Sequence, residues 1–375
     1  MSSDDELYAD GLRDLVRSHA IRPGEFPDTA GLLRDTSKGG WLELVRLGFS
    51  GSDDVSLESA LLSCEVFGRE AAPFTVVTTA GFIQPLLSAI GVETAFAGHV
   101  GSWIESGRIV AVPVARPGTA AEDWRFGLSG NVTSDVADGV TKVSGRIDRL
   151  TDAAAEFILV TFDCGSGIAA IPIDSDGVTV TTKPSIVPGL EVSSVDLDAV
   201  KVDAALIHSA NVADCVNNAV GTWSVVLDAY AVGVERELVE RTVSYVSTRR
   251  QFGQAIGAFQ GVQHIAADMH VAAETSFGIM SEAATRWVDG ASDAVDHIAA
   301  SRLHCAASAI SCCESAIQLH GGAGFTWELG LHYWYRAAQF LLGYLSDELA
   351  LRELLVARIS QELVGTAPPV EDLEP

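Results

Sequence analysis

The sequence predicts an α+β fold with an N-terminal α-helical domain, a central antiparallel β-sheet or barrel domain and a C-terminal four-helix bundle. Helical periodicity extends to about residue 106, and short β-branched runs follow it. From about Ala205 the period returns to 3.6 and continues toward the C-terminus. We therefore place the domains at 1–106, 107–204 and 205–375.

The composition is that of a folded, acidic protein. Of its 375 residues, 48% are apolar and 20% are charged, and the formal net charge is -26. This charge repels nucleic acid and anionic membranes, so we expect neither as a partner, and an anionic ligand would require a local positive pocket. No apolar run approaches the roughly 20 residues that cross a bilayer, and the N-terminus lacks a signal-peptide pattern. We expect a cytoplasmic protein.

The cysteines and histidines show no metal-binding pattern. The six cysteines contain no CxxC pair, and the nine histidines show no HExxH spacing. We expect reduced, buried thiols and no metal.

Helical periodicity marks five segments of the N-terminal domain. Ser56 is a plausible N-cap for the third of them. The domain shows no catalytic signature. The segments are Glu6–Ala20, Trp41–Leu47, Leu57–Arg69, Thr78–Ile90 and Thr94–Ser106.

The central domain contains β-branched runs separated by Gly, Asp and Pro turns. Because no helix alternates with these runs, they predict an antiparallel sheet or small barrel rather than a doubly wound sheet. No GxGxxG follows a strand, which disfavours a Rossmann dinucleotide site. The predicted strands are Arg108–Ala115, Val140–Val143, Phe157–Phe162, Ile168–Ile173, Val178–Thr182 and Leu190–Val202.

The C-terminal domain is predicted to contain four long helices. The first ends near Arg249, and the second begins at Gln260. The third covers Ser292–Leu319, and the last covers Leu331–Leu363. Short connections between long helices indicate an antiparallel bundle.

The connection at 249–260, RRQFGQAIGAFQ, combines a cation with an aromatic ring and open backbone. Arg249 could simply satisfy the dipole of the helix that it ends. However, Phe252 adds a flat face, two glycines leave the loop backbone open, and arginine suits bidentate contact with a diphosphate. The helix beginning at Gln260 offers N–H groups that favour anions. The segment predicts a site for a large, planar, anionic cofactor.

A second segment, Gln318–Phe325 (QLHGGAGF), repeats this combination of a polar anchor and exposed backbone. A glycine helix cap is the simpler interpretation. HGGxG is also similar to the oxyanion loop of esterases, but that chemistry requires a GxSxG nucleophile elbow, which the sequence lacks. We reject a hydrolase.

Together, Arg-x-x-Phe-Gly, the following Phe-Gln and the later QxHGGxGF resemble the acyl-CoA dehydrogenase family. Tyr335 and Arg336 match a further region of that family, and the helix–sheet–helix order extends the resemblance to essentially the whole chain. The resemblance implies FAD as cofactor and α,β-dehydrogenation of an acyl-CoA thioester. It implies that a carboxylate takes the α-proton while the flavin accepts the β-hydride, and that an electron-transfer flavoprotein is the electron acceptor.

The resemblance also assigns the cofactor contacts. In the family, these groups reach the FAD held mainly by the neighbouring subunit, so here they would act in trans. The carried-over residues are Arg249, Gln251 and Phe252 for the diphosphate and adenosine, Phe259 and Gln260 for the adjacent surface, and Gln318, Gly321 and Gly322 for the adenine end.

The family's catalytic carboxylate is missing from this sequence. Leu345 stands at its common position and Trp223 at the alternative one. The flavin-side loops of the family correspond to 115–120 and 148–152, where Thr151 is the one flavin contact that is plausibly retained. The chain therefore resembles a subunit that keeps the contacts made in trans and has lost its own site.

This pattern predicts the base-lacking subunit of a heteromeric α2β2 acyl-CoA dehydrogenase, similar to those of bacterial steroid side-chain breakdown. A related subunit would carry the glutamate, and a steroid side-chain CoA ester is a candidate substrate. No catalytic residue is predicted in this chain. One alternative is a self-sufficient enzyme that uses Glu348 or Asp347 as its base, with Glu348 a weak candidate. The other is a non-catalytic scaffold of the same fold.

Overall fold

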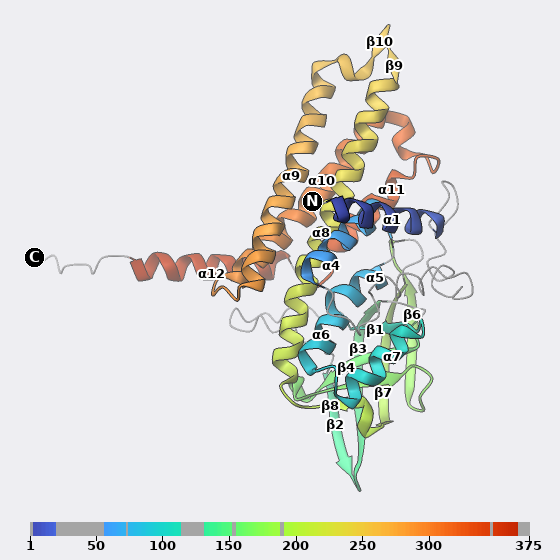
Figure 1. Cartoon of the computed structure of the whole chain (residues 1–375), viewed down its shortest axis with the longest axis vertical. Helices are drawn as coiled ribbons and strands as arrows, with labels where there is room; N and C mark the ends of the chain where they lie inside the picture. Colours follow the sequence, from blue (N-terminus) through green and yellow to red (C-terminus); the bar gives the residue numbers. More distant parts are fainter. Residues whose placement is uncertain are drawn as a thin grey trace, which may run out of the picture.

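The computed structural model describes residues 3–19, 56–72, 74–113, 131–151, 155–187, 191–345 and 348–366 (Figure 1). The molecule is elongated, with two β-sheets toward one end of its long axis and a hairpin between two long helices at the other. N-terminal helices lie against the bundle and beside the sheets. The predicted α+β architecture is confirmed.

The N-terminal helices begin where the sequence offers caps. Ser56 Oγ accepts a hydrogen bond from the Ser59 N–H at 3.2 Å, and Thr94 Oγ1 accepts one from Ala97 at 3.2 Å. Both helices were predicted to within one residue, whereas the predicted helix at 41–47 lies outside the described residues. The elements are α1 (Ser3–His19), α4 (Leu57–Arg69), α5 (Phe74–Thr78), the π-helical turn η3 (Thr79–Ile83), α6 (Gln84–Ile90) and α7 (Ala95–Glu105).

The described part of the central domain forms two four-stranded sheets. The first has the order β1-β4-β5-β8, from β1 (Val110–Ala111), β4 (Phe157–Phe162), β5 (Gly167–Pro172) and β8 (Ile207–His208). The second has the order β2-β3-β7-β6, from β2 (Asn131–Ala137), β3 (Val140–Thr151), β7 (Glu191–Val202) and β6 (Val178–Pro184).

Antiparallel pairing dominates both sheets, as predicted, but β1 and β4 pair in parallel. The sequence did not predict β2, because most of its described side chains are exposed and it lacks a continuous apolar run. Its pairing with β3 depends on the turn at Asp138 and Gly139, where both residues have positive φ.

The bundle is formed by α8 (Val212–Thr248), α9 (Gln260–Val288), α10 (Ala294–His320) and α11 (Leu331–Leu342). The middle of α8 is buried on every side, from Trp223 to Glu235. A helix that is apolar all round belongs inside a domain, and α8 accordingly packs on α4, α9 and α10.

The predicted last helix, Leu331–Leu363, is wrong as a single element. It is divided into α11 and α12 (Glu348–Thr366). Leu345 adopts φ +64, a left-handed conformation that an α-helix does not accept. Arg302 Nη2 donates to the carbonyl oxygens of Leu341 at 2.9 Å and Tyr344 at 3.2 Å, which stabilises the break.

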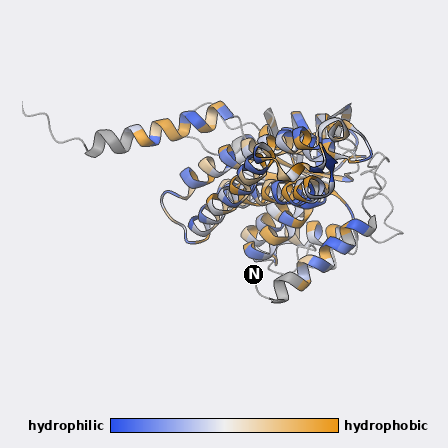
Figure 2. Cartoon of the chain, turned by 90° about the horizontal axis from the view of Figure 1, so that it is seen from above, coloured by the Kyte–Doolittle hydropathy of each residue, from blue (hydrophilic) through white to orange (hydrophobic). Residues whose placement is uncertain are grey.

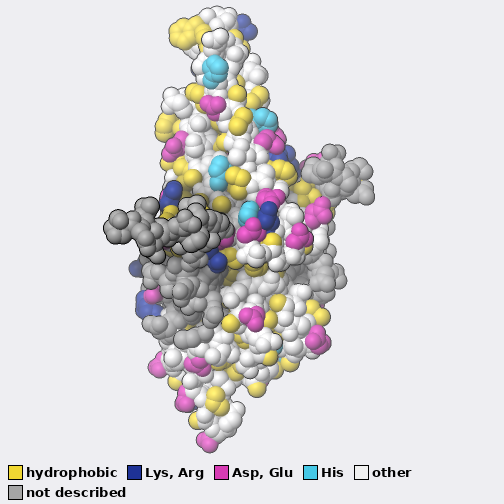
Figure 3. Space-filling model, turned by 90° about the vertical axis from the view of Figure 1, so that its left-hand side faces the viewer, with side chains coloured by type: hydrophobic (Ala, Val, Ile, Leu, Met, Phe, Trp, Pro, Cys, Tyr) yellow, Lys and Arg dark blue, Asp and Glu magenta, His cyan; other side chains and the backbone are white. Residues whose placement is uncertain are grey.

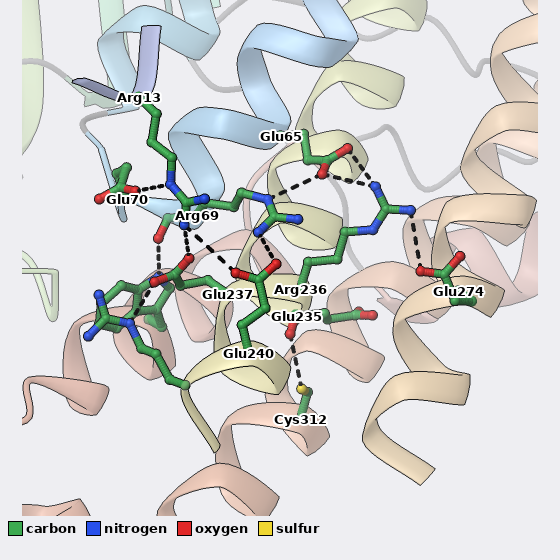
Figure 4. A network of polar contacts seen from close by, with 12 residues as sticks. Arg13, Glu65, Arg69, Glu70, Glu235, Arg236, Glu237, Glu240, Glu274 and Cys312 are labelled. Atoms are coloured by element: carbon green, nitrogen blue, oxygen red, sulfur yellow. Dashed lines mark hydrogen bonds and ion pairs between the residues drawn. The ribbon is translucent and has the colours of Figure 1, made fainter. Parts of the chain in front are cut away.

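Ion pairs tie the N-terminal helices to the bundle (Figure 4). Arg13 of α1 donates to Glu70 at 2.8 Å and also contacts Glu237 of α8. Arg69 of α4 pairs with Glu240 at 2.7 Å, and Arg236 pairs with Glu65 at 2.9 Å. Because several charges share partners, the network fixes the relative position of α1, α4 and α8 better than an isolated surface pair would. 

The described cysteine side chains are free and buried, as predicted, and they are Cys64, Cys215, Cys305, Cys312 and Cys313. No helix in the described ranges is long and apolar enough to cross a membrane.

Candidate functional site

The first cofactor-like segment forms a hairpin at the end of the bundle. Arg249 is the C-cap of α8, and β9 (Arg250–Gln251) pairs with β10 (Gln254–Ala255). The two turn residues, Phe252 and Gly253, have φ +52 and +84, the left-handed pair that a tight two-residue hairpin turn requires.

The hairpin returns to the bundle through the 3-10 turn η6 (Ile256–Ala258). Gly257 packs closely in this turn, because a Cβ there would lie 3.1 Å from the Val246 carbonyl oxygen. Phe259 is the N-cap of α9, and Gln260 is its first residue, as predicted. The hairpin is thereby held against the end of α8.

The hairpin presents its functional groups to solvent. Phe252 is 91% exposed, and its ring meets Phe259 edge-on at 6.2 Å between centroids. Arg249, Gln251 and Gln260 are exposed. Figure 3 shows hydrophobic and basic side chains together at this tip.

Arg249 differs from most arginines of the chain. Within the described part of the chain, its guanidinium makes no hydrogen bond or ion pair, whereas Arg69 and Arg236 each pair with two carboxylates. In a protein of net charge -26, an unpaired cation beside an exposed ring is a local anion-binding feature.

The second segment follows α10. Gln318 is exposed in the last turn, and Gly321, with φ +58, ends the helix. The 3-10 turn η7 (Gly321–Phe325) then leaves Gly321 and Gly322 exposed. Gly324 is sterically required, because a Cβ there would lie 2.6 Å from the Ile317 carbonyl oxygen.

The structure brings the two segments together through Tyr245 and His320. Their rings stack with centroids 4.3 Å apart, and the Tyr245 hydroxyl donates to the His320 carbonyl at 3.4 Å. Burial lowers the pKa of His320, which disfavours the charged form of the stacked imidazole. Since Tyr245 lies one turn before Arg249, the base of the hairpin and the end of α10 form one surface. The motif spacing did not reveal this contact.

The position that would hold the catalytic base is closed. Leu345 is 2% exposed and Trp223 is fully buried. The indole meets Phe82 at 5.2 Å and, edge-on, Tyr344 at 5.4 Å between centroids. It also lies against the backbone of η3, since a Cβ on Gly81 would come within 2.9 Å of its Cδ1. Aromatic and aliphatic side chains therefore fill the space.

Thr151, which was predicted to be the one retained flavin contact, belongs to the same buried cluster of side chains. It is 3% exposed, and its Oγ1 lies 3.1 Å from the Tyr344 hydroxyl. The same hydroxyl lies 3.3 Å from Thr78 Oγ1. The three hydroxyls join the β-domain, the N-terminal helices and the turn after α11. The other loop of the prediction, 115–120, lies outside the described residues.

A buried ion pair supports the turn that carries Leu345. Arg302 Nη1 lies 2.7 Å from Asp228 Oδ1, and both side chains are almost completely buried. Burial raises the pKa of Asp228 above its ordinary value, and Arg302 and Ser301 oppose that shift. Arg302 thereby links Asp228 to the backbone of the turn that carries Leu345, although nothing in the local sequence indicated it.

The alternative base lies on the surface. Glu348 is the first residue of α12, and it pairs with Arg352 at 2.7 Å in a half-exposed i,i+4 ion pair. Asp347 lies outside the described residues. Among the residues that the structure describes, no group of three His, Cys, Asp or Glu could hold a metal ion.

Comparison with known proteins identifies the fold. Residues 224–344 match the family model of the acyl-CoA dehydrogenase C-terminal domain. Glutaryl-CoA dehydrogenase from Mycobacterium smegmatis superimposes with a TM-score of 0.80 at 18% identity, over 98% of this chain and 96% of that one. The chain has the acyl-CoA dehydrogenase fold. This family and its structural neighbours are FAD-dependent flavoproteins, which is the predicted cofactor class.

Sequence relatives support the same family. The chain is 29% identical to acyl-CoA dehydrogenase IpdE2 of Mycobacterium tuberculosis, over 31% of this chain and 35% of that protein. Matches to the next relatives likewise span 17 to 29% of their lengths. Probable acyl-CoA dehydrogenase YngJ of Bacillus subtilis is 25% identical over 91% of both chains.

Proposed function

We propose that this chain is a subunit of an FAD-dependent acyl-CoA dehydrogenase that provides FAD contacts to a related partner subunit, which carries the catalytic glutamate. The observation that carries the proposal is a contrast within one chain. The Arg249 guanidinium is exposed and unpaired among the described residues, whereas Leu345 and Trp223 fill the place of the base.

The residues of the hairpin surface fit the outer half of FAD. Arg249 would neutralise the diphosphate, and Phe252 would cover the adenosine with a flat apolar face. Gln260 stands at the N-terminus of α9, where N–H groups favour an anion. The remaining predicted contacts, Gln251, Phe259, Gln318, Gly321 and Gly322, complete this proposed surface. When bound, FAD supplies the hydride acceptor.

This chain's own residues do not provide the proton acceptor. A leucine at 345 has no group that takes an α-proton, and Trp223 occupies space that an acyl chain would need. Glu348 instead pairs with Arg352 at the surface. A homo-oligomer would repeat this defect in every site, whereas pairing with a related, intact subunit restores one site per heterodimer.

The proposal therefore specifies an α2β2 heterotetramer that oxidises an acyl-CoA between its α and β carbons. A steroid side-chain CoA ester is the candidate substrate, and an electron-transfer flavoprotein is the candidate electron acceptor. The location that we propose is the cytoplasm.

Co-expression tests the proposal. The chain is purified alone and together with a related subunit that has the glutamate, and flavin absorbance, mass and turnover of acyl-CoA are measured. We expect little FAD and no turnover from the chain alone, and one FAD per heterodimer with turnover from the mixture. If the chain alone carries one FAD per subunit and turns over acyl-CoA, the proposal is wrong.

A further inference from the structure

Tyr245 connects the two cofactor-like segments through both its backbone and its side chain. It lies on α8, which packs side by side with α10 in the bundle (Figure 1, Figure 2). Its carbonyl oxygen accepts a hydrogen bond from the Arg249 N–H at 2.8 Å, where the hairpin begins. Its ring stacks on that of His320, with 25° between the ring planes, and its hydroxyl donates to the carbonyl that precedes Gly321. One residue therefore links the backbone at Arg249 to the backbone at Gly321.

The His320 side chain is fixed on its own side of this contact. It is 5% exposed, and its Nδ1 donates to the Ala316 carbonyl oxygen at 2.7 Å. The turn after α10 packs closely on it, because a Cβ on Gly324 would lie 3.2 Å from the His320 Cβ. The imidazole therefore cannot turn away from Tyr245 without breaking a buried hydrogen bond, which is costly.

The proposed FAD contacts lie on this fixed base. The side chains of Arg249 and Gln318 are exposed, and so are Gly321 and Gly322. Ordering exposed groups costs free energy when a ligand binds, and the cost is smaller where the backbone already has its bound arrangement. A contact that keeps the end of α8 in place against the end of α10 therefore favours a ligand that touches both ends.

We propose that Tyr245 and His320 are positioning residues for FAD. Their stacked rings set the separation between Arg249, assigned to the diphosphate, and the adenine contacts at Gly321 and Gly322. The inference rests on the proposed function, because it takes the hairpin surface as the FAD contact. In the ADP half of FAD, one ribose joins the adenine to the diphosphate, so a surface that holds its two contacts at a fixed separation suits this half.

Calorimetric titration of the apo heteromer with FAD, and with ADP alone, tests the positioning role. We expect Y245L and H320L, which each remove one ring, to bind both ligands roughly 3- to 10-fold more weakly than the wild type, the range that corresponds to the energy of one aromatic pair. The double variant Y245L/H320L should bind no more weakly than either single variant, because both changes break the same contact. H320F returns a ring to this position and should bind more tightly than H320L.

The stacked rings of Trp103 on α7 and Phe157 on β4 provide the matched control. Their centroids lie 3.6 Å apart, so W103L also removes one ring of a stacked aromatic pair. Because this pair lies outside both cofactor-like segments, W103L should lower the free energy of unfolding but keep the wild-type affinities for FAD and ADP. Urea unfolding measures the first quantity and calorimetry the second. If W103L weakened FAD binding as much as Y245L does, the cause would be a general loss of stability, and the positioning role would be wrong.

The R249Q variant separates this inference from the proposed function. If R249Q binds FAD weakly while Y245L and H320L bind it like the wild type, the positioning role is wrong and the FAD contact stands. If all three variants bind like the wild type, the proposed FAD surface is wrong as well. Should Y245L fail to assemble, H320L and H320F decide the question, since equal affinities of these two variants would overturn the inference.

Discussion

Arg249 and Arg302 show how the environment of a side chain separates two functions of the same residue type. Arg302 is buried, pairs with Asp228 and holds two backbone carbonyls, so its role is structural. Arg249 is exposed, and no described residue pairs with its guanidinium. The sequence motif identified Arg249 because its neighbours are local, and it missed Arg302 because its partners come from α8 and from the end of α11.

Replacing Arg249 by Gln tests the diphosphate contact. We expect R249Q to assemble with the related subunit and to unfold like the wild type, but to bind FAD roughly 10- to 100-fold more weakly, because one charge-assisted contact is lost. Flavin titration of the apo heteromer measures this. Arg146, exposed on β3 and paired with Asp196, is the control, and R146Q should bind FAD normally. Unchanged FAD affinity of R249Q would refute the assignment.

Glu235 is a buried carboxyl that the sequence did not single out. Burial raises its pKa to about 8, although its Oε1 accepts a hydrogen bond from Ser276 at 3.0 Å. Since the folded state holds the proton more tightly than the unfolded state, stability is greatest below the ordinary glutamate pKa and is lost as the pH rises through about 8.

We therefore expect the free energy of unfolding of the wild type to fall between pH 5 and 8 relative to that of E235Q. Urea unfolding at several pH values measures it. Glu353 is exposed on α12, and E353Q should keep the wild-type slope. Parallel pH profiles for E235Q and the wild type would contradict the shift.

At the scale of elements, local signals predicted most helix ends to within one residue, but they did not predict the break inside the last predicted helix. The cap at Ser56 is read from a few consecutive residues and was predicted, whereas Thr94 was predicted as the first residue of its helix and is its N-cap. The break between α11 and α12 depends on Arg302, which is distant in sequence. Because the helical periodicity continues across the break, the sequence predicted a single helix there. The same limitation hid the Tyr344 hydroxyl contacts, whose partners are Thr78 and Thr151.

The buried ion pair between Arg302 and Asp228 should determine how strongly the break between α11 and α12 is stabilised. In R302M, Asp228 remains buried without its cation, and we expect a loss of about 3–5 kcal/mol in the free energy of unfolding. The double variant R302M/D228L should recover part of it, but not the hydrogen bonds to the two carbonyls. Urea unfolding compares them. R286M, which removes two exposed ion pairs of α9 (with Glu282 and Asp293), should change stability little. An equally small effect of R302M would contradict a stabilising role for the buried pair.

At the scale of the whole molecule, the order of the three domains followed from changes of periodicity, and the candidate cofactor surface followed from two motifs. What the sequence could not give was the contact between those motifs, because Tyr245 and His320 are unremarkable in their own segments. It also could not give the filled interior around Trp223, which combines residues of α8, η3 and the turn after α11.

The E348Q variant distinguishes two hypotheses. In one, the related subunit carries the catalytic base; in the other, this chain is self-sufficient and Glu348 is the base. We expect E348Q in the heteromer to keep turnover within about twofold of the wild type, since exposed ion pairs contribute little. Replacing the glutamate of the related subunit should abolish turnover in the same assay. Loss of turnover in E348Q with FAD retained would instead make Glu348 the base.

The length of α8 has a consequence for how the two regions can be tested. At a rise of about 1.5 Å per residue, Trp223 and Arg249 lie roughly 39 Å apart along one continuous helix. We therefore expect substitutions around Trp223 to leave the packing of the hairpin unchanged, so the two ends of α8 can be altered independently.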